Sequence, residues 1–250
     1  DPKEYLNEAL NEIAAGRGPV IWTIPNDWMA KYHDKLVAMP DGKLANKKNK
    51  KTDLETYQDS FYPVVAQNNI IDNKIYGIPL VLDTLSLYYN PTLLQKALTE
   101  YQKTAASEAQ NNYKLFTDGP ANWDEVSQLS QILTKKSGRN ITQSGIALGA
   151  ADKINQAVDT LTVMMIQQGA QMTTDDFSSA QFQTSTNLFD GSAFPGAKAL
   201  TLYTSYADPN SENYAWNDSL STDARRAFAE EKAAMFIDYP SAQSEIKRIN

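Results

Sequence analysis

Apolar residues recur three or four positions apart in several stretches of the chain, which is the pattern of amphipathic helices. In residues 3–15 this spacing predicts a helix that ends at Gly16 and Gly18. Other helix starts carry recognisable caps, including Asn90 before Pro91 and a capping box formed by Asn122 and Glu125. The further predicted helices cover residues 57–68, 91–101, 122–133, 154–168, 195–206 and, with Ser221 or Thr222 as cap, 221–232.

Short continuous apolar runs lie between these helices and predict buried strands. The run VIWTI at residues 20–24 is bounded by proline at both ends, and two more runs flank a central Asp-Thr pair. Since helices alternate with short buried strands, the pattern predicts an α/β fold. The predicted strands cover residues 20–24, 76–82, 85–89, 144–148 and 233–237.

The composition excludes several classes of function. The 250 residues carry a formal net charge of -7, which argues against a nucleic-acid surface. There is no cysteine, so the chain has no disulfide framework, no thiol nucleophile and no thiolate metal site. No uninterrupted apolar run approaches the roughly 18 residues that a membrane span needs. The length suits one large or two medium domains.

Catalytic motifs are absent from the sequence. His33 is the only histidine, so we predict neither a histidine-based general base nor a two-histidine metal site. The glycine-rich phosphate-binding motifs and the serine nucleophile motif are also missing. We therefore predict no catalytic residue, no metal and no cofactor.

Polar residues and aromatic rings follow the predicted strands. Asp83 and Thr84 separate two apolar runs, but a two-residue hairpin between strands would favour Asn-Gly or Gly-X at these positions. Carboxylates and amides hydrogen-bond hydroxyl groups, and aromatic faces stack on apolar C–H surfaces. Because an α/β sheet gathers its strand ends at one edge, the pattern predicts a sugar-type recognition site. The loops that carry it contain Asn26, Asp27 and Trp28; Asp83 and Thr84; Tyr214, Trp216, Asn217 and Asp218; and Asp238 and Tyr239.

Several ordered motifs resemble bacterial extracellular solute-binding proteins of family 1, the mostly sugar-binding lipoproteins that supply ABC importers. The resemblance covers nearly the whole chain. Two departures are Glu231, where the family usually has glycine, and Val20, where it usually has aspartate. The motifs are Gly16–Ile21, Ile75–Pro79 with Asp83-Thr84 and Leu87–Asn90, Asn122–Glu125, Asn155 with Gln168-Gly169, and Phe228 with Lys232–Met235.

The resemblance implies a two-lobe α/β fold of the type II periplasmic-binding-protein kind, with a ligand cleft between the lobes. The first lobe is expected at residues 1–117 and the second at residues 118–250, each incomplete because family members usually continue at both ends. By the family pattern, the lobes close on the solute by hinge motion, and no chemistry is performed. The ligand-binding residues expected from this pattern are Asn26, Asp27, Asp83, Thr84, Asn155, Trp216, Asp238 and Tyr239.

The implied function is capture of a mono- or oligosaccharide and its delivery to the transmembrane permease of an ABC importer. The resemblance further implies a monomer outside the cytoplasm, in the periplasm or on the cell surface, anchored by lipid through a segment absent from this chain. Three alternatives stay open. The chain could bind a non-sugar solute such as a peptide or polyamine, act as a carbohydrate-active enzyme through cleft carboxylates, or serve as an adhesin-like surface protein.

Overall fold

The computed structural model describes residues 2–45, 48, 50–174, 178–185 and 194–249. The chain divides into two compact units, residues 1–82 (unit 1) and residues 83–250 (unit 2). The lobe boundary expected near residue 117 concerns the complete protein and stays a prediction.

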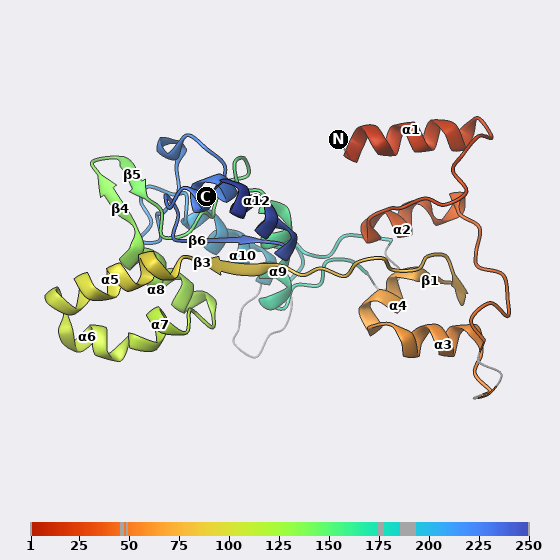
Figure 1. Ribbon diagram of the computed structural model, residues 1–250, viewed down its shortest axis with the longest axis horizontal. Helices are drawn as coiled ribbons and strands as arrows, with labels where there is room; N and C mark the ends of the chain where they lie inside the picture. The colour runs from red at the N-terminus through yellow and green to blue at the C-terminus, as the bar shows by residue number, and fades with distance from the viewer. Residues whose placement is uncertain (1, 46–47, 49, 175–177, 186–193, 250) are drawn as a thin grey trace. The chain divides into compact units, whose positions relative to one another are not determined.

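Unit 1 contains short helices and one small hairpin (Figure 1). The helix predicted at residues 3–15 is confirmed as α1. The helix predicted at residues 57–68 is wrong as a single element, because Pro63 begins a second helix after a break at residues 61–62. The elements are α1 (Pro2–Ala14), α2 (Asn26–Tyr32), a 3-10 turn (His33–Lys35), α3 (Asp53–Ser60), α4 (Pro63–Asn69), β1 (Ile70–Ile71) and β2 (Lys74–Ile75).

The core of unit 1 is small. It is built around Tyr57, Ala66 and Ile75, with a few partly buried apolar side chains packed against them. The fully buried Tyr57 ring reaches across the unit, and its hydroxyl donates a hydrogen bond of 2.8 Å to the Gly77 carbonyl oxygen. This bond fixes the position at which the chain leaves the hairpin.

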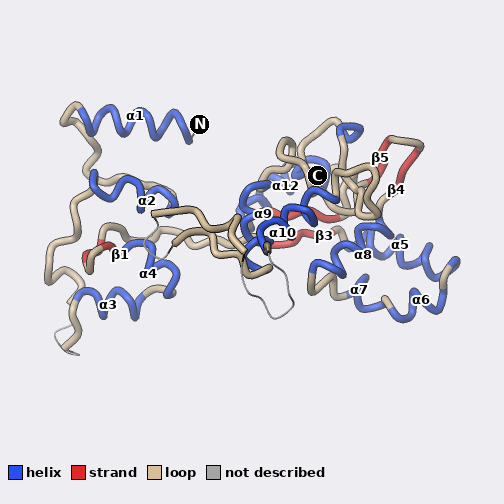
Figure 2. Tube along the Cα trace, turned by 180° about the vertical axis from the view of Figure 1, so that it is seen from behind, coloured by secondary structure: helices blue, strands red, loops and turns tan. Residues whose placement is uncertain are grey.

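The strands predicted at residues 20–24 and 76–82 do not form in this structure. Both segments are loops (Figure 2). A strand requires a neighbouring strand to exchange backbone hydrogen bonds. Among the described residues, the one backbone bond of this kind in the two segments is from the Tyr76 N–H to the Asn69 carbonyl, at 2.9 Å, next to the β1–β2 pair. The prediction of strands at residues 20–24 and 76–82 is therefore wrong for this structure.

Unit 2 holds most of the regular structure. Its helices are α5 (Pro91–Thr104), α6 (Ala106–Asn111), α7 (Tyr113–Thr117), α8 (Trp123–Leu133), α9 (Ala157–Gln167), α10 (Pro195–Ser205), α11 (Ala224–Ala229) and α12 (Gln243–Ile249). Its strands are β3 (Ser86–Tyr89), β4 (Lys135–Ser137), β5 (Asn140–Gln143) and β6 (Met235–Asp238), and 3-10 turns cover Asp218–Leu220 and Pro240–Ala242.

The strand β6 lies at the centre of unit 2. It pairs antiparallel with β3, so that Ser86 faces Asp238 and Tyr89 faces Met235. On its other side, Ser144 and Ala147 make isolated parallel bridges to residues 233 and 236. The predicted strands at residues 85–89 and 233–237 are thus confirmed, and the one at 144–148 is present only as these bridges.

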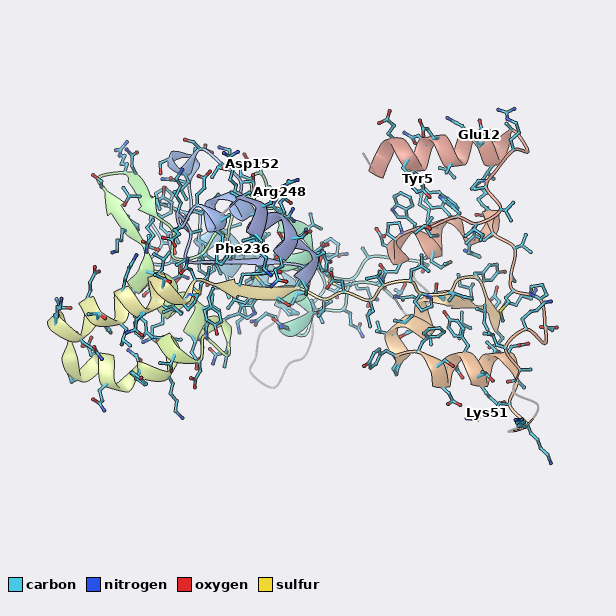
Figure 3. The ribbon with its side chains drawn as sticks, in the orientation of Figure 1. Tyr5, Glu12, Lys51, Asp152, Phe236 and Arg248 are labelled. Carbon is cyan, nitrogen blue, oxygen red and sulfur yellow. The ribbon has the colours of Figure 1, made fainter. Side chains whose placement is uncertain are left out.

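Two apolar clusters surround this central strand. The larger one gathers the buried faces of α5, α8, α9 and α10, as their helical spacing predicts. The smaller one contains Phe236, labelled on β6 in Figure 3, together with Trp216, Ala227 and Ile141. Both faces of the strand are covered, which agrees with its continuous apolar sequence.

The predicted helix caps are mostly confirmed. The Asn90 side chain accepts hydrogen bonds from the backbone N–H groups of Thr92 and Leu93. Asn122 accepts one from Glu125, but the Glu125 carboxylate accepts from Ala121 and not from Asn122, so only half of the capping box forms. The cap predicted for α11 is wrong. Asp223 takes that place, because its carboxylate reaches the Arg226 N–H at 3.1 Å.

The end of α11 explains why the family that this sequence resembles usually has glycine at the position of Glu231. Glu231 has a left-handed φ of 56°. Its N–H donates to the Phe228 carbonyl, and the N–H of Lys232 donates to the Ala227 carbonyl. These two bonds form a Schellman motif, in which the left-handed residue is most often glycine. Glu231 therefore adopts a conformation that side chains disfavour by about 1–2 kcal/mol.

Substituting Glu231→Gly is expected to raise the free energy of unfolding by about 0.5–1 kcal/mol. The relief of the left-handed conformation exceeds the extra backbone entropy that glycine brings to the unfolded chain. Urea denaturation measures the change. Glu231→Ala is the matched control, since it removes the same side chain but keeps the strain. Equal stability of the two variants would contradict the explanation.

Candidate functional site

Polar side chains gather at one end of the β3–β6 pair. Asp238, the last residue of β6, faces Ser86, the first residue of β3. Asp83 and Thr84 come just before β3, and Tyr239 comes just after β6, so these residues reach the same end of the sheet. This arrangement brings together polar residues that are about 150 positions apart in the sequence.

The carboxylate of Asp238 is fully buried, and both of its oxygens accept hydrogen bonds from other groups of the protein. One oxygen accepts from Arg225 Nε at 2.9 Å and Nη2 at 2.8 Å. The other oxygen accepts from Gln156 Nε2 at 3.1 Å and from the Tyr239 N–H at 2.8 Å. Asp238 was predicted to bind ligand. In this structure it instead holds Arg225, Gln156 and the backbone of Tyr239 in place.

Arg225 lies between two carboxylates. It pairs with Asp238 on β6 and with Glu245 on α12. Partial burial lowers the pKa of Arg225, but hydrogen bonds and charges of both carboxylates outweigh that effect and raise the pKa. Asn155 contributes here as well, since its side-chain oxygen accepts a 3.0 Å bond from the Arg225 N–H. The predicted ligand residue Asn155 is exposed but anchors the start of α11.

Tyr239 presents a half-buried ring beside this ion pair. Its hydroxyl donates a 3.0 Å hydrogen bond to Asp159 Oδ2 on α9. Burial, the bond to Asp159 and the charges of Asp159, Asp83 and Asp238 raise the pKa of Tyr239 to about 12. The hydroxyl therefore keeps its proton at physiological pH and remains a hydrogen-bond donor.

Tyr88 on β3 supports Tyr239 from the opposite strand. Its hydroxyl donates a 3.0 Å hydrogen bond to the Tyr239 carbonyl oxygen. Burial and the negative charges of Asp238 and Asp83 raise the pKa of Tyr88, against the opposing charge of Arg225. The charge of Asp83 thus acts on both tyrosines at this end of the sheet.

Asp83 and Thr84 are exposed. One carboxylate oxygen of Asp83 accepts from the Thr84 N–H at 2.9 Å. The rest of the Asp83 carboxylate and the Thr84 hydroxyl have no hydrogen-bond partner among the described residues. An Asp-Thr pair between two apolar runs is therefore accommodated at the sheet edge and does not lie in the core.

The remaining predicted residues are Trp216 in unit 2 and Asn26 and Asp27 in unit 1. Trp216 is only 2% exposed and packs in the smaller apolar cluster of unit 2, so its ring has no free face for stacking on a sugar. Asn26 and Asp27 are exposed in the first turn of α2, in unit 1. Their part in a common site stays a prediction.

Sequence reasoning missed Asp159, Gln156 and Arg225. Asp159 is in the first turn of a helix, where an acidic residue is commonplace because of the helix dipole. Arg225 is a charged residue at a helix start and carries no signal of burial. Only the fold shows that these residues converge on Asp238 and Tyr239.

The resulting set combines carboxylate acceptors, hydroxyl donors and an aromatic ring. Asp83 and Asp159 offer acceptors, Thr84 offers a hydroxyl donor, and the Tyr239 ring offers an apolar face, whereas the Tyr239 hydroxyl proton is already donated to Asp159. These groups match the alternating hydroxyl and C–H surfaces of a saccharide.

Comparison with known proteins supports this assignment at the level of the family. The family described as bacterial extracellular solute-binding protein matches residues 3–248. A protein of Brucella abortus, named as a binding protein without a stated ligand, is 22% identical over 243 residues. That alignment covers 97% of this chain and 49% of the relative, so the chain spans about half the length of the curated relatives that it matches.

Solved structures share the fold at low sequence identity. The GacH receptor of Streptomyces glaucescens, studied with acarbose, aligns with a TM-score of 0.65 at 19% identity, over 98% of this chain and 52% of its own. A Thermotoga lettingae ABC transporter solute-binding protein bound with α-D-tagatose aligns with a TM-score of 0.61 at 21% sequence identity. The alignment covers 100% of this chain and 55% of that protein. The maltose-maltodextrin binding protein of Alicyclobacillus acidocaldarius aligns with a TM-score of 0.63 at 14% sequence identity. The alignment covers 100% of this chain and 53% of that protein.

These likenesses confirm the predicted fold class, the α/β fold of two-lobe periplasmic binding proteins. Within the described residues, no helix is long and apolar enough to cross a membrane. The family match extends from the first helix of unit 1 to the last helix of unit 2. The chain belongs to the bacterial extracellular solute-binding protein family.

Proposed function

We propose that the protein containing this chain captures a carbohydrate outside the cytoplasm and delivers it to the permease of an ABC importer. The observation that carries the proposal is the convergence of Asp83, Thr84, Asp159 and Tyr239 at one end of the β3–β6 pair. The family match supports the transport role. The tagatose, acarbose and maltodextrin ligands named for the solved structures support a sugar.

The proposed mechanism is binding without chemistry. The exposed carboxylate of Asp83 accepts hydrogen bonds from ligand hydroxyl groups, and Tyr239 stacks on a pyranose face. Asp238 and Asn155 hold these groups in position without touching ligand. The family and the solved structures are binding proteins, which supports a non-enzymatic role.

The remaining features of the proposal follow the family pattern. The complete protein is a monomer that binds no nucleic acid and works in the periplasm or on the cell surface, held by a lipid anchor. Asn26 and Asp27 are retained as additional ligand residues on the same basis. The acidic net charge of the chain supports the absence of nucleic-acid binding.

A cationic solute such as a polyamine is the second candidate, because Asp83 and Asp159 both place negative charge beside Tyr239. Thermal-shift screening of the complete protein against sugars, amino acids and polyamines separates the two candidates. A ligand present at about 100 times its dissociation constant adds roughly 2.7 kcal/mol of stability. Stabilisation by polyamines alone would replace the sugar assignment.

Asp83→Ala is expected to weaken binding of the sugar found in that screen by an order of magnitude or more. The substitution removes a charge-assisted hydrogen bond to ligand hydroxyls, which contributes about 1.5–3 kcal/mol. Calorimetric titration measures the change. Asp118→Ala, at an exposed position after α7, is the control and keeps the original affinity. An unchanged affinity of the Asp83→Ala variant would remove Asp83 from the site.

A further inference from the structure

The candidate site in unit 2 has free hydrogen-bond acceptors on two carboxylates. The side chain of Asp83 is exposed, and that of Asp159 is half-buried. Each uses one oxygen within the protein, since Asp83 accepts from the Thr84 N–H at 2.9 Å and Asp159 accepts from the Tyr239 hydroxyl at 3.0 Å. The second oxygen of each carboxylate has no hydrogen-bond partner among the described residues. Both carboxylates can therefore accept a hydrogen bond from a ligand.

The direction of the bond between Tyr239 and Asp159 determines what the tyrosine offers. An ionised carboxylate has no proton to donate, so the Tyr239 hydroxyl is the donor. Burial, this bond and the charges of nearby carboxylates raise the pKa of Tyr239 to about 12, so the proton stays in place at neutral pH. The hydroxyl oxygen keeps its capacity to accept. Of the four site residues, only Thr84 retains a side-chain proton for a ligand acceptor.

No free cation balances the two carboxylates within the described part of the chain. Neither Asp83 nor Asp159 forms an ion pair with a described lysine or arginine. Arg225 is the cation at this end of the sheet, and it is bound to both Asp238 and Glu245. One positive and two negative charges leave that group negative as well.

The lysine in the loop before α9 is also paired. The Lys153 ammonium group donates a 2.6 Å hydrogen bond to Asp218. This bond and the charges of Asp218 and Asp152 raise the pKa of Lys153. By contrast, the charges that act on the Tyr239 hydroxyl come from carboxylates. A ligand beside the Tyr239 ring therefore meets a negative field.

The acceptors and the field favour one class of ligand group. A sugar hydroxyl or amino group can donate a hydrogen bond to a carboxylate, and the carboxylate charge strengthens that bond. A sugar carboxylate or phosphate is ionised at neutral pH. It would place acceptor against acceptor and negative charge against negative charge, which is strongly unfavourable across an interface.

We propose that this end of the β3–β6 pair selects neutral or amino-substituted sugars and rejects sugars that carry a carboxylate or a phosphate. Asp83 and Asp159 are the residues that determine this selectivity. The inference rests on the proposed function, because it requires a saccharide bound beside Tyr239. It adds the charge class of that saccharide.

Matched sugars that differ only at carbon 6 test the selectivity of the complete protein. Each set contains a neutral sugar, its uronate and its 6-phosphate, for example glucose, glucuronate and glucose 6-phosphate. Further sets are based on galactose, on mannose and on oligosaccharides of these sugars. Thermal shift identifies the sets that bind, and calorimetry at low salt measures the dissociation constant of each member.

The neutral member of a binding set is expected to bind at least about 100-fold more tightly than its uronate or 6-phosphate. An acidic member that binds within about 10-fold of the neutral one would overturn the inference and leave the proposed function standing. If no sugar of any set binds, the proposed function fails and the inference fails with it.

Two variants test whether Asp83 and Asp159 cause the rejection. Asp83→Asn and Asp159→Asn each remove one negative charge and keep a side-chain oxygen that can accept. Each is expected to reduce the ratio of neutral to acidic affinity by about 5- to 10-fold. Asp118→Asn, at an exposed position after α7, is the control and keeps the ratio. The ratio cancels any loss of affinity that a variant causes for both ligands alike. Unchanged ratios in both site variants would overturn the proposal.

Salt separates rejection by charge from rejection by shape. Between about 0.01 M and 1 M salt the screening length falls from about 30 Å to about 3 Å. The affinity ratio of the unsubstituted protein is therefore expected to fall at least about threefold over this range. A ratio that does not change with salt would assign the rejection to the shape of the site and contradict the role of the two carboxylates.

Discussion

Replacing Arg225 by alanine is expected to lower the free energy of unfolding by about 3–5 kcal/mol, because it leaves a buried carboxylate without its cation. The Asp238 side chain is 1% exposed and the Arg225 side chain 21% exposed, so water does not replace the lost partner. The variant also breaks the link to Glu245 on α12. Urea denaturation, followed by circular dichroism, measures the change.

Arg226→Ala is the matched control for this substitution. Arg226 is the next residue on α11 and pairs with Glu230 across the helix surface, where its side chain is 61% exposed. An exposed pair of this kind contributes less than about 1 kcal/mol. A double variant, Arg225→Met with Asp238→Leu, removes both charges and is expected to recover part of the lost stability, because the Gln156 amide and the Tyr239 N–H lose their acceptor. If Arg225→Ala and Arg226→Ala destabilise equally, the ion pair is not the source of the effect.

Tyr239→Ala is expected to weaken sugar binding by about 10- to 100-fold, since stacking on an aromatic ring contributes about 1–3 kcal/mol when it is lost with its hydrogen bond. Tyr239→Phe keeps the ring and removes only the hydroxyl that donates to Asp159. Its expected loss is smaller, below about 10-fold. Calorimetry of the complete protein with the sugar found in the thermal-shift screen measures both variants.

The stability of each Tyr239 variant is measured alongside its affinity. The backbone N–H that bonds Asp238 and the carbonyl that accepts from Tyr88 are present in both the alanine and the phenylalanine variant. Both variants therefore keep the local backbone, and a loss of affinity reports on the side chain. Equal losses for alanine and phenylalanine would assign the effect to the hydroxyl and contradict stacking.

The helices could be predicted from the sequence because their signals are local. Each signal depends only on residues a few positions away in the sequence. The apolar stripe of residues 3–15 and the caps Asn90 and Asn122 are examples, and all three appear in the structure. The errors are local too. Asp223 competed with Ser221 and Thr222 for the cap of α11, and only the actual helix start decides between neighbouring polar residues.

The strands depend on partners that are distant in sequence. Residues 85–89 became β3 because β6 lies beside them, about 150 positions later. Residues 20–24 have an equally apolar pattern but no partner among the described residues, so they remain a loop. The apolar pattern indicates that a segment is suited to form a strand, but the strand forms only where another strand is available to pair with it.

The roles of single residues in the candidate site also depend on neighbours that are distant in sequence. Asp238 and Tyr239 are adjacent, and the sequence gives no reason to treat them differently. The backbone stays extended at Tyr239, just after β6, and successive side chains of extended backbone point to opposite sides. Asp238 is therefore enclosed by Arg225 and Gln156, while Tyr239 reaches Asp159. Trp216 likewise stands in a loop with polar neighbours but packs in the core.

The bonds that hold the peptide of Tyr239 have a consequence for the energetics of recognition. Asp238 binds its N–H and Tyr88 binds its carbonyl, so the backbone under the ring is already ordered in the free protein. The entropy of immobilising this segment is lost when the chain folds and not when a ligand arrives. Under the proposed function, preorganisation of this kind lets a modest contact surface reach useful affinity, and it couples that affinity to the Arg225–Asp238 ion pair behind Tyr239.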